Sequence, residues 1–408
     1  MTQDRQSAGR GVARPPALLV RDARVVTMTD RGTLPRGSVL VEGDRIAAVA
    51  PDLPVPEGAE VMEAAGRVLM PGFVDAHTHA LWAGDRLDEF AAQCAGASYL
   101  DVLEAGGGIM STVRAVRAAS REELTIKLRA RLDRMLRAGT TTMEVKSGYG
   151  LSTEHELKSL QAIGDAAAGF PGTVVPTALL GHAVDPEVPD FFERVVGETL
   201  PAVSDAHPGI VVDAYCERSA WPVEACARLF EAAAALGHPF RVHADQFTAL
   251  GMTEWAADHG ASSVDHLETS TPHALERLAR SGSYAVALPV CGLHLDDRYT
   301  DGRRFLDTDG GSGRLVIATN YNPGSAPAWS MPLVVALAVR KVGLTIDEAL
   351  RACTVHAARL LGFEDRGTVE VGARADLALL HHRDERLLAY ELGGDPVAWV
   401  LCGEVGGD

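Results

Sequence analysis

PGFVDAHTHALWAGDR, residues 71–86, places His77 and His79 two positions apart at the end of a short apolar run. Successive side chains of a β-strand point to opposite faces, so residues i and i+2 share one face. The two imidazoles therefore converge on one point, and neutral imidazole is a common ligand of divalent metals. A chance His-x-His pair on a surface strand is the alternative, and histidines elsewhere in the chain must decide between them.

Length and composition describe a large globular protein. The 408 residues fit one large α/β barrel with an added domain better than several small modules. The net charge of −17 argues against nucleic acid or an anionic membrane as a partner. A small anionic substrate stays open, because the local cations of a pocket set that preference.

The cysteines and the N-terminus bear on the compartment. Six cysteines are scattered without a C-x-x-C pair, which suits neither a disulfide scaffold nor a thiolate zinc site. Residues 1–16 are polar and predict a disordered tail, and no later segment reaches membrane-spanning length. We expect a cytoplasmic protein.

Both ends of the chain have the texture of a small sheet. Short β-type runs separated by Gly, Pro and Asp turns fill residues 17–70, and a similar pattern returns near the C-terminus. We predict one composite β-sandwich domain made of residues 17–70 and 366–408.

Residues 71–365 contain eight short apolar runs that alternate with helical stretches. The runs are 72–77, 140–145, 173–180, 210–215, 240–245, 262–267, 284–290 and 315–320. Capping-box patterns at Ser120/Glu123, Thr153/Glu156 and Thr345/Glu348 mark helix starts. Eight strand–helix cycles predict an α/β fold, a TIM-type (β/α)8 barrel, with a doubly wound open sheet as the competing fold.

Polar residues repeatedly end these apolar runs, which favours the barrel because the carboxyl ends of barrel strands surround one mouth. They are His77, His79, Lys146, His182, Glu217, His243, His266 and Asn320. In this arrangement His77, His79 and His243 meet, with His266 on the next strand. Three protein ligands leave an open position where a metal lowers the pKa of water and supplies hydroxide as a nucleophile. For either His243 or His266 alone, a hydrogen-bonded buried histidine is the simpler interpretation.

Several motifs together resemble one family. They are DAHTHALWAGDR, GASYLDVLEAGGGI, TTTMEVKSGYGL, LLGHAV, VHADQ, VDHLE and NPGS. The chain resembles the imidazolonepropionase family of metal-dependent amidohydrolases from about residue 17 to 403. The resemblance implies the barrel and two-ended β-domain, a homodimer, and hydrolysis of 4-imidazolone-5-propanoate to N-formimidoyl-L-glutamate in histidine degradation. It also implies one divalent ion, Zn²⁺ or Fe²⁺, between which imidazole ligands do not discriminate.

Carried over by motif, the resemblance assigns metal ligation to His77, His79 and His243. Substrate contacts fall on Arg86, Tyr149, His182, Gln246, Asn322, Gly324 and Ser325, with Tyr99 nearby as a weaker candidate. Arg86 offers a planar fork to the propionate carboxylate, and Tyr149 can donate to the same anion. The alternatives are a surface ion pair for Arg86 and packing beneath the KSGYG turn for Tyr149.

Proton transfer is assigned to His266, which orients or deprotonates the water and later protonates the departing ring nitrogen. Gln246 can hold the ring by hydrogen bonds but cannot shuttle protons, so we assign it to binding. Lys146 resembles the carboxylated lysine of two-metal amidohydrolases, yet a structural ion pair is the better interpretation.

Asn320 departs from the family pattern, in which an aspartate completes the metal site and handles the water proton. The Asn320 carbonyl can coordinate the metal, but it brings no charge and accepts no proton. Three accounts compete: a natural variant in which His266 alone handles the proton, a related cyclic amidohydrolase acting on a substituted imidazolone- or hydantoin-type propionate, and an impaired or non-catalytic binding protein. We favour the first and assign Asn320 to both the metal site and catalysis.

Overall fold

A computed structural model describes residues 17–96, 107–218 and 220–403. Eight parallel strands form the central sheet in the order β13-β12-β11-β10-β9-β8-β7-β6. They are β6 (Phe73–Asp75), β7 (Thr140–Lys146), β8 (Thr173–Gly181), β9 (Val211–Cys216), β10 (Arg241–Ala244), β11 (Ser263–His266), β12 (Tyr284–Ala287) and β13 (Leu315–Ile317). Each predicted apolar run overlaps one of these strands, in the predicted order, and β7, β8 and β9 extend one residue beyond their runs.

The sheet is closed just beyond the ends of β6 and β13. The amide of Asn320 donates to the His77 carbonyl at 3.0 Å, and the amide of His79 donates to the Tyr321 carbonyl at 3.0 Å. Thr78 and Tyr321 form a parallel bridge between these bonds. The predicted barrel is therefore confirmed over the open sheet, and its closure falls on the segments that carry His77, His79 and Asn320.

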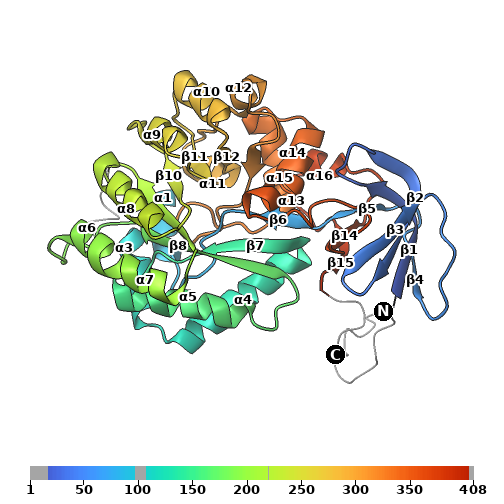
Figure 1. The fold of residues 1–408 in the computed structure, drawn as a ribbon, viewed down its shortest axis with the longest axis horizontal. Helices are drawn as coiled ribbons and strands as arrows, with labels where there is room; N and C mark the ends of the chain where they lie inside the picture. Colours follow the sequence, from blue (N-terminus) through green and yellow to red (C-terminus); the bar gives the residue numbers. More distant parts are fainter. Residues whose placement is uncertain (1–16, 97–106, 219, 404–408) are drawn as a thin grey trace.

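Helices surround the barrel strands (Figure 1). On the first half of the barrel they are α1 (Leu87–Cys94), α3 (Ile109–Ala118), α4 (Arg121–Arg137), α5 (Thr153–Ala167), α6 (Phe191–Arg194), the π-helical segment η1 (Val195–Thr199), α7 (Leu200–Ala206) and α8 (Val223–Ala235). On the second half they are α9 (Met252–Asp258), α10 (Pro272–Ser281), α11 (Pro289–Leu295), α12 (Gly302–Asp307), α13 (Met331–Leu337), the π-helical segment η2 (Ala338–Val342), α14 (Ile346–Ala352) and α15 (Val355–Leu360). A short α16 (Leu387–Tyr390) follows near the C-terminal end.

Two of the three predicted helix starts are confirmed. Ser120 caps α4, and Thr345 with Glu348 forms a complete capping box on α14. The predicted start of α5 is wrong by one residue, because Ser152 rather than Thr153 is the N-cap. The Glu156 carboxylate instead accepts the backbone N–H groups of Gly148, Gly150 and Leu151 at 2.8–2.9 Å, so it holds the KSGYG turn.

Strands from both chain ends form one seven-stranded mixed sheet in the order β15-β14-β5-β1-β2-β3, with β4 paired to β1. They are β1 (Ala17–Val26), β2 (Thr33–Glu42), β3 (Arg45–Ala50), β4 (Glu60–Glu63), β5 (Val68–Pro71), β14 (Leu377–Leu380) and β15 (Val397–Leu401). Figure 1 shows the N-terminal strands in blue beside β14 and β15 in red. The composite β-domain is confirmed, whereas the boundaries 17–70, 71–365 and 366–408 stay predictions.

Only Gly72 separates β5 of the composite sheet from β6 of the barrel. A Cβ atom at this position would lie 2.4 Å from the Thr141 side chain, so only glycine fits. The Gly72 amide donates to the Asp376 carbonyl at 2.8 Å. The strand that leads to His77 and His79 is thus a direct continuation of the composite sheet.

Two further observations concern the sequence predictions. Within the described ranges, no helix is long and apolar enough to cross a membrane, and none of the six cysteines forms a disulfide bond. The predicted tail 1–16 and the weaker candidate Tyr99 lie outside the described residues.

Candidate metal centre

Imidazoles from four strand ends gather at the barrel mouth. Ligand nitrogens of His77, His243 and His266 lie within 4.8 Å of one another. His79 joins them, since its Nε2 lies 3.2 Å from Nε2 of His243. His182 stacks on His79 with ring centroids 5.0 Å apart. The structure therefore brings together all five histidines that the sequence analysis selected.

Buried carboxylates fix the ring orientation of two of these histidines. Nδ1 of His77 lies 2.6 Å from Oδ2 of Asp265, and Nδ1 of His243 lies 3.1 Å from Oδ1 of Asp213. A neutral imidazole that donates through Nδ1 keeps its Nε2 lone pair for a metal, which is the usual carboxylate–histidine–metal arrangement. Both Nε2 atoms are thereby prepared as ligands.

Three buried polar atoms in this cluster have no hydrogen-bond partner among the described residues: Nε2 of His77, Nδ1 of His79 and Oδ1 of Asn320. Unpaired buried acceptors are costly and rare, and a bound cation would give Nε2 of His77 and Oδ1 of Asn320 the partner that they lack. Two nitrogens bound to one tetrahedral zinc lie about 3.3 Å apart, which matches the 3.2 Å between His79 and His243. The residues present fit a divalent metal.

Burial keeps the prospective ligands neutral. Burial, together with the positive charge of Lys146 and the neighbouring imidazoles, lowers the pKa of His77 well below 6.5. Burial and the nearby histidines have the same effect on the pKa of His79, and burial outweighs Asp213 to lower the pKa of His243. Because metals bind deprotonated imidazole, the site needs little proton release at neutral pH.

A buried ionic network lies beneath the histidines. Lys146 Nζ contacts Glu144 Oε1 at 2.6 Å and Asp213 Oδ2 at 2.8 Å, with all three side chains fully buried. Arg241 Nη2 contacts Asp265 Oδ2 at 2.6 Å. The Thr78 amide, between the two metal-site histidines, donates to Glu144 Oε2 at 3.1 Å. Lys146 thus has the structural ion pair expected of it, and the network holds both carboxylates that orient His77 and His243.

His266 differs from the other histidines in its charge. Burial alone would lower its pKa, but Glu268 and Cys291 outweigh burial and raise it to about 10. Its Nδ1 lies 3.0 Å from Oε1 of Glu268.

The backbone of His266 has φ 84°, and that of Asn320 has φ 56°. Such left-handed conformations are strained in residues other than glycine and cluster at functional sites.

Arg86 is engaged by other side chains. Its Nη1 lies 2.7 Å from Oε2 of Glu89, and its Nε donates to Thr112 Oγ1 at 2.9 Å. The ion pair that the sequence analysis gave as the alternative is therefore present. Arg86 nevertheless lies close enough to Tyr149 to act on the pKa of that phenol, which burial raises.

Tyr149 and His182 lie side by side next to the histidine cluster. Their ring centroids are 4.9 Å apart, and Tyr149 lies 6.2 Å from the His79 ring. Nδ1 of His182 donates to the Gly148 carbonyl at 3.0 Å, and burial lowers the pKa of this histidine to about 3. Both side chains therefore border the prospective metal.

The predicted NPGS residues form a compact turn after β13. Oδ1 of Asn322 accepts the amides of Gly324 and Ser325 at 2.8 and 2.7 Å, and its Nδ2 donates to the Asn320 carbonyl at 2.6 Å. The backbone amides of Gly324 and Ser325, two residues assigned to substrate contact, are thus bonded to Asn322 in this conformation. Gln246, which follows β10, donates to Cys291 Sγ at 3.2 Å.

Comparison with known proteins agrees with this geometry. The chain is 44% identical to an imidazolonepropionase of Rubrobacter xylanophilus over 89% of each chain. It is 43% identical to that of Deinococcus radiodurans, over 92% of this chain and 93% of the relative. Residues 68–387 match the amidohydrolase family. The chain belongs to the imidazolonepropionase branch of the amidohydrolases.

Solved structures place this amidohydrolase in the same fold class. A triazine hydrolase variant superposes with a TM-score of 0.72 over 95% of this chain and 93% of that chain, at 19% identity. Atrazine chlorohydrolase from Arthrobacter aurescens, solved with zinc, gives 0.71 over 94% of each chain, also at 19% identity. At this identity the likeness shows the fold alone.

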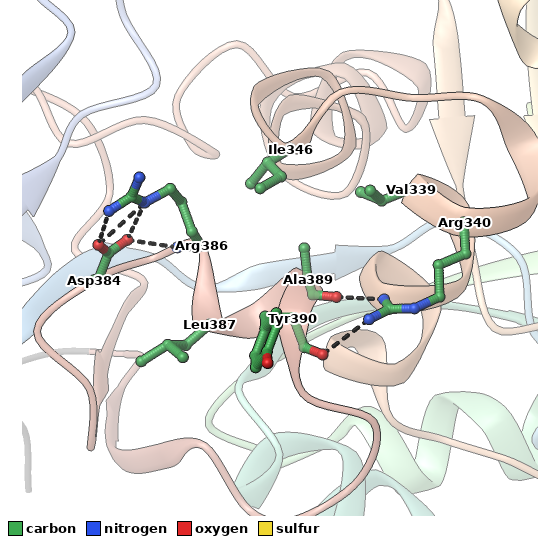
Figure 2. A pocket seen from close by; sticks show the side chains of 8 residues that line it. All are labelled: Val339, Arg340, Ile346, Asp384, Arg386, Leu387, Ala389 and Tyr390. Carbon is green, nitrogen blue, oxygen red and sulfur yellow. Dashed lines mark hydrogen bonds and ion pairs between the residues drawn. The ribbon is translucent and has the colours of Figure 1, made fainter.

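A surface pocket of about 530 Å³ lies elsewhere on this amidohydrolase, among η2, α14 and α16. Figure 2 shows its two guanidinium groups already bound, Arg340 to the carbonyls of Ala389 and Tyr390 and Arg386 to Asp384. No predicted site residue lines it. We therefore keep the histidine cluster as the candidate active site.

Sequence reasoning missed the carboxylates that support the cluster: Glu144, Asp213, Asp265 and Glu268. The first three stand inside otherwise apolar strand runs, and a charged residue in such a run predicts a buried ionic partner. That signal was available, although the identity of each partner depends on strand pairing. Cys291 gave no comparable signal.

Proposed function

We propose that this amidohydrolase hydrolyses 4-imidazolone-5-propanoate to N-formimidoyl-L-glutamate. Water is added to the ring, a ring C–N bond is broken, and the ring nitrogen leaves with a proton. The observation that carries the proposal is the set of neutral, pre-oriented imidazoles at the barrel mouth of a chain 40–44% identical to imidazolonepropionases.

We further propose that His77, His79 and His243 hold one divalent ion, Zn²⁺ or Fe²⁺, with Oδ1 of Asn320 available as a neutral fourth donor. The unpaired Nε2 of His77 and Oδ1 of Asn320 support this assignment, as does the 3.2 Å between Nε2 of His79 and Nε2 of His243. The ion would lower the pKa of a water molecule and so supply a nucleophile near neutral pH.

In this proposal His266 handles the protons. A ring nitrogen of His266 lies within 4.8 Å of ring nitrogens of His77 and His243. Its Nδ1 lies 3.0 Å from Oε1 of Glu268. A protonated His266 can donate to the departing ring nitrogen, and the neutral ring can accept the water proton. Asn320 has no acidic group to share that task, so its role is to bind and orient.

The substrate carboxylate would be held by Arg86 and Tyr149, with His182, Gln246, Asn322, Gly324 and Ser325 along the rest of the ligand. The buried positions of Tyr149 and His182 beside His79 support this arrangement of substrate contacts. For Arg86 to bind the carboxylate, the substrate must compete with Glu89. A charge-assisted, bidentate contact between Arg86 and the substrate carboxylate would be strong enough to replace the pair of Arg86 with Glu89.

The test couples metal analysis to a substrate assay on the wild type beside Asn320→Asp, each loaded with one equivalent of Zn²⁺ or Fe²⁺. We expect the wild type to form N-formimidoylglutamate, and Asn320→Asp to retain metal at least tenfold more tightly because it adds a charged oxygen. Metal-loaded wild type that binds the substrate without product would overturn the hydrolytic function. Turnover confined to Asn320→Asp would identify an impaired enzyme, and faster turnover of a substituted imidazolone would identify a different ring substrate.

We also propose a homodimer, on the strength of the family resemblance. Sedimentation equilibrium at micromolar concentration tests this assignment, and a single species of about 43 kDa would contradict it.

A further inference from the structure

A second group of metal-binding side chains lies beside the histidine cluster. Ligand atoms of His266, Glu268 and Cys291 lie within 4.8 Å of one another. They come from the end of β11, the loop that follows it and the first turn of α11. Glu268 and Cys291 have no part in the proposed chemistry apart from their effect on His266.

The donor atoms of this group define the kind of cation that it suits. The Glu268 side chain is 5% exposed, and its Oε1 lies 3.0 Å from Nδ1 of His266. Cys291 is buried, and its Sγ accepts a hydrogen bond from Gln246 at 3.2 Å. A nitrogen, an oxygen and a sulfur donor together favour zinc-like or softer ions such as Cd²⁺ over Mg²⁺. A carboxylate and a thiolate also match the charge of a divalent ion.

We propose that His266, Glu268 and Cys291 form a second, inhibitory site for Zn²⁺ or Cd²⁺. On binding, the S–H bond of Cys291 breaks and a metal–sulfur bond forms, while the thiol proton and the Nδ1 proton of His266 leave to solvent. The cation then binds the imidazole of His266, which transfers protons in the proposed function. The expected effect on activity therefore rests on that function. Excess metal should therefore inhibit an enzyme that one equivalent activates.

The second site should be weaker than the first. At the first site, Nε2 of His77 and Oδ1 of Asn320 have no protein partner among the described residues. At the second, a cation must displace the Gln246 amide from Cys291 and the His266 ring from its contact with Glu268. Binding therefore replaces existing hydrogen bonds, which lowers the net gain.

The experiment starts from protein holding one equivalent of zinc, titrated with Cd²⁺. Total metal per chain, the thiolate-to-cadmium absorption in the near ultraviolet and the turnover rate are measured together. For the wild type we expect a second equivalent, a thiolate band and at least a tenfold loss of activity. For Cys291→Ser we expect one equivalent, no band and activity that withstands excess metal.

Matched variants separate this site from other thiols. Cys94→Ser removes an exposed thiol, and Cys226→Ser removes a buried thiol that contacts Cys216; both should behave as the wild type. Glu268→Gln should weaken the band and serves as the second test if Cys291→Ser does not fold. Wild-type protein without a thiolate band, or Cys291→Ser with an unchanged titration, would overturn the proposal. Band and stoichiometry need no turnover, so a failure of the proposed function stays distinguishable.

Discussion

Oδ2 of Asp265 lies 2.6 Å from Nδ1 of His77 and 2.6 Å from Nη2 of Arg241. A single carboxylate oxygen therefore joins a proposed metal ligand to a buried guanidinium. The carboxylate thus accepts from Arg241 and from Nδ1–H of His77 through the same oxygen, and the second contact favours the His77 proton on Nδ1. The Nε2 lone pair is left for the metal.

Asp265→Asn should weaken metal binding by about 10- to 100-fold, because an amide that donates to Nδ1 would shift the His77 proton to Nε2. Competition with a chromophoric chelator measures the affinity. Asp258→Asn, which alters an exposed pair with Arg277, is the control and should change nothing. Equal affinities for wild type and Asp265→Asn would show that Asp265 does not orient the ligand.

Lys146→Met should lower the free energy of unfolding by about 3–5 kcal/mol, because it removes the buried cation that contacts both Glu144 and Asp213 and leaves Glu144 only the longer contact with Arg241 at 3.4 Å. Urea denaturation of the metal-free protein measures the effect. Lys127→Met breaks an exposed pair with Glu123 and should cost at most about 1 kcal/mol. A Lys146 variant as stable as the Lys127 variant would mean that the network tolerates an unpaired charge.

Arg86→Met should raise KM about tenfold or more and change kcat less, since it removes a charge-assisted contact made before and during the reaction. Steady-state kinetics on the proposed substrate separates the two constants. Glu89→Gln frees the guanidinium and should leave KM unchanged or lower it. If KM in Arg86→Met equals that of the wild type, Arg86 serves only its pair with Glu89.

We predict that His356 causes part of the loss of folding stability at low pH. Burial lowers its pKa to about 4 in the folded protein, against about 6.5 in the unfolded chain. The unfolded state therefore binds the proton first, and stability is lost as pH falls from about 6.5 to 4. His356→Gln, which can still donate to the Leu315 carbonyl, should remove about 2 kcal/mol of this loss.

Urea denaturation in chelator at pH 7 and pH 5 tests the His356 prediction. Chelation is needed because the metal-site histidines have lowered pKa values too and would add metal release to the measurement. Identical pH dependence in wild type and His356→Gln would contradict it.

The sequence predicted the barrel well because each strand is a local signal. A run such as GFVDAH needs no distant partner to be recognised, and the histidines at the strand ends follow from it. The short strand β4 gives no such signal, since EVME has no marked apolar pattern. The start of α5 was misplaced because Glu156 is used by the preceding turn instead of by a capping box.

Contacts between distant strands were beyond sequence reasoning. The local sequence does not predict that Asp265 contacts Nδ1 of His77 or that Asp213 contacts Nδ1 of His243, because each pair depends on the closure and register of the barrel. The pair of Arg86 with Glu89 is the opposite case, because the two residues are three positions apart and the contact is local. There the sequence does not show whether Arg86 binds Glu89 or the substrate. Site residues are thus easier to predict than their partners.

The single residue between β5 and β6 has a consequence for biosynthesis. β14 pairs with β5, Leu377 opposite Pro71 and Leu379 opposite Leu69, so the strand that leads into His77 lacks one neighbour until nearly the whole chain has left the ribosome. The nascent protein must keep β5, which runs directly into the first barrel strand, available for one of the last strands made. Assembly of the region that carries His77 and His79 is therefore expected to finish only after translation ends.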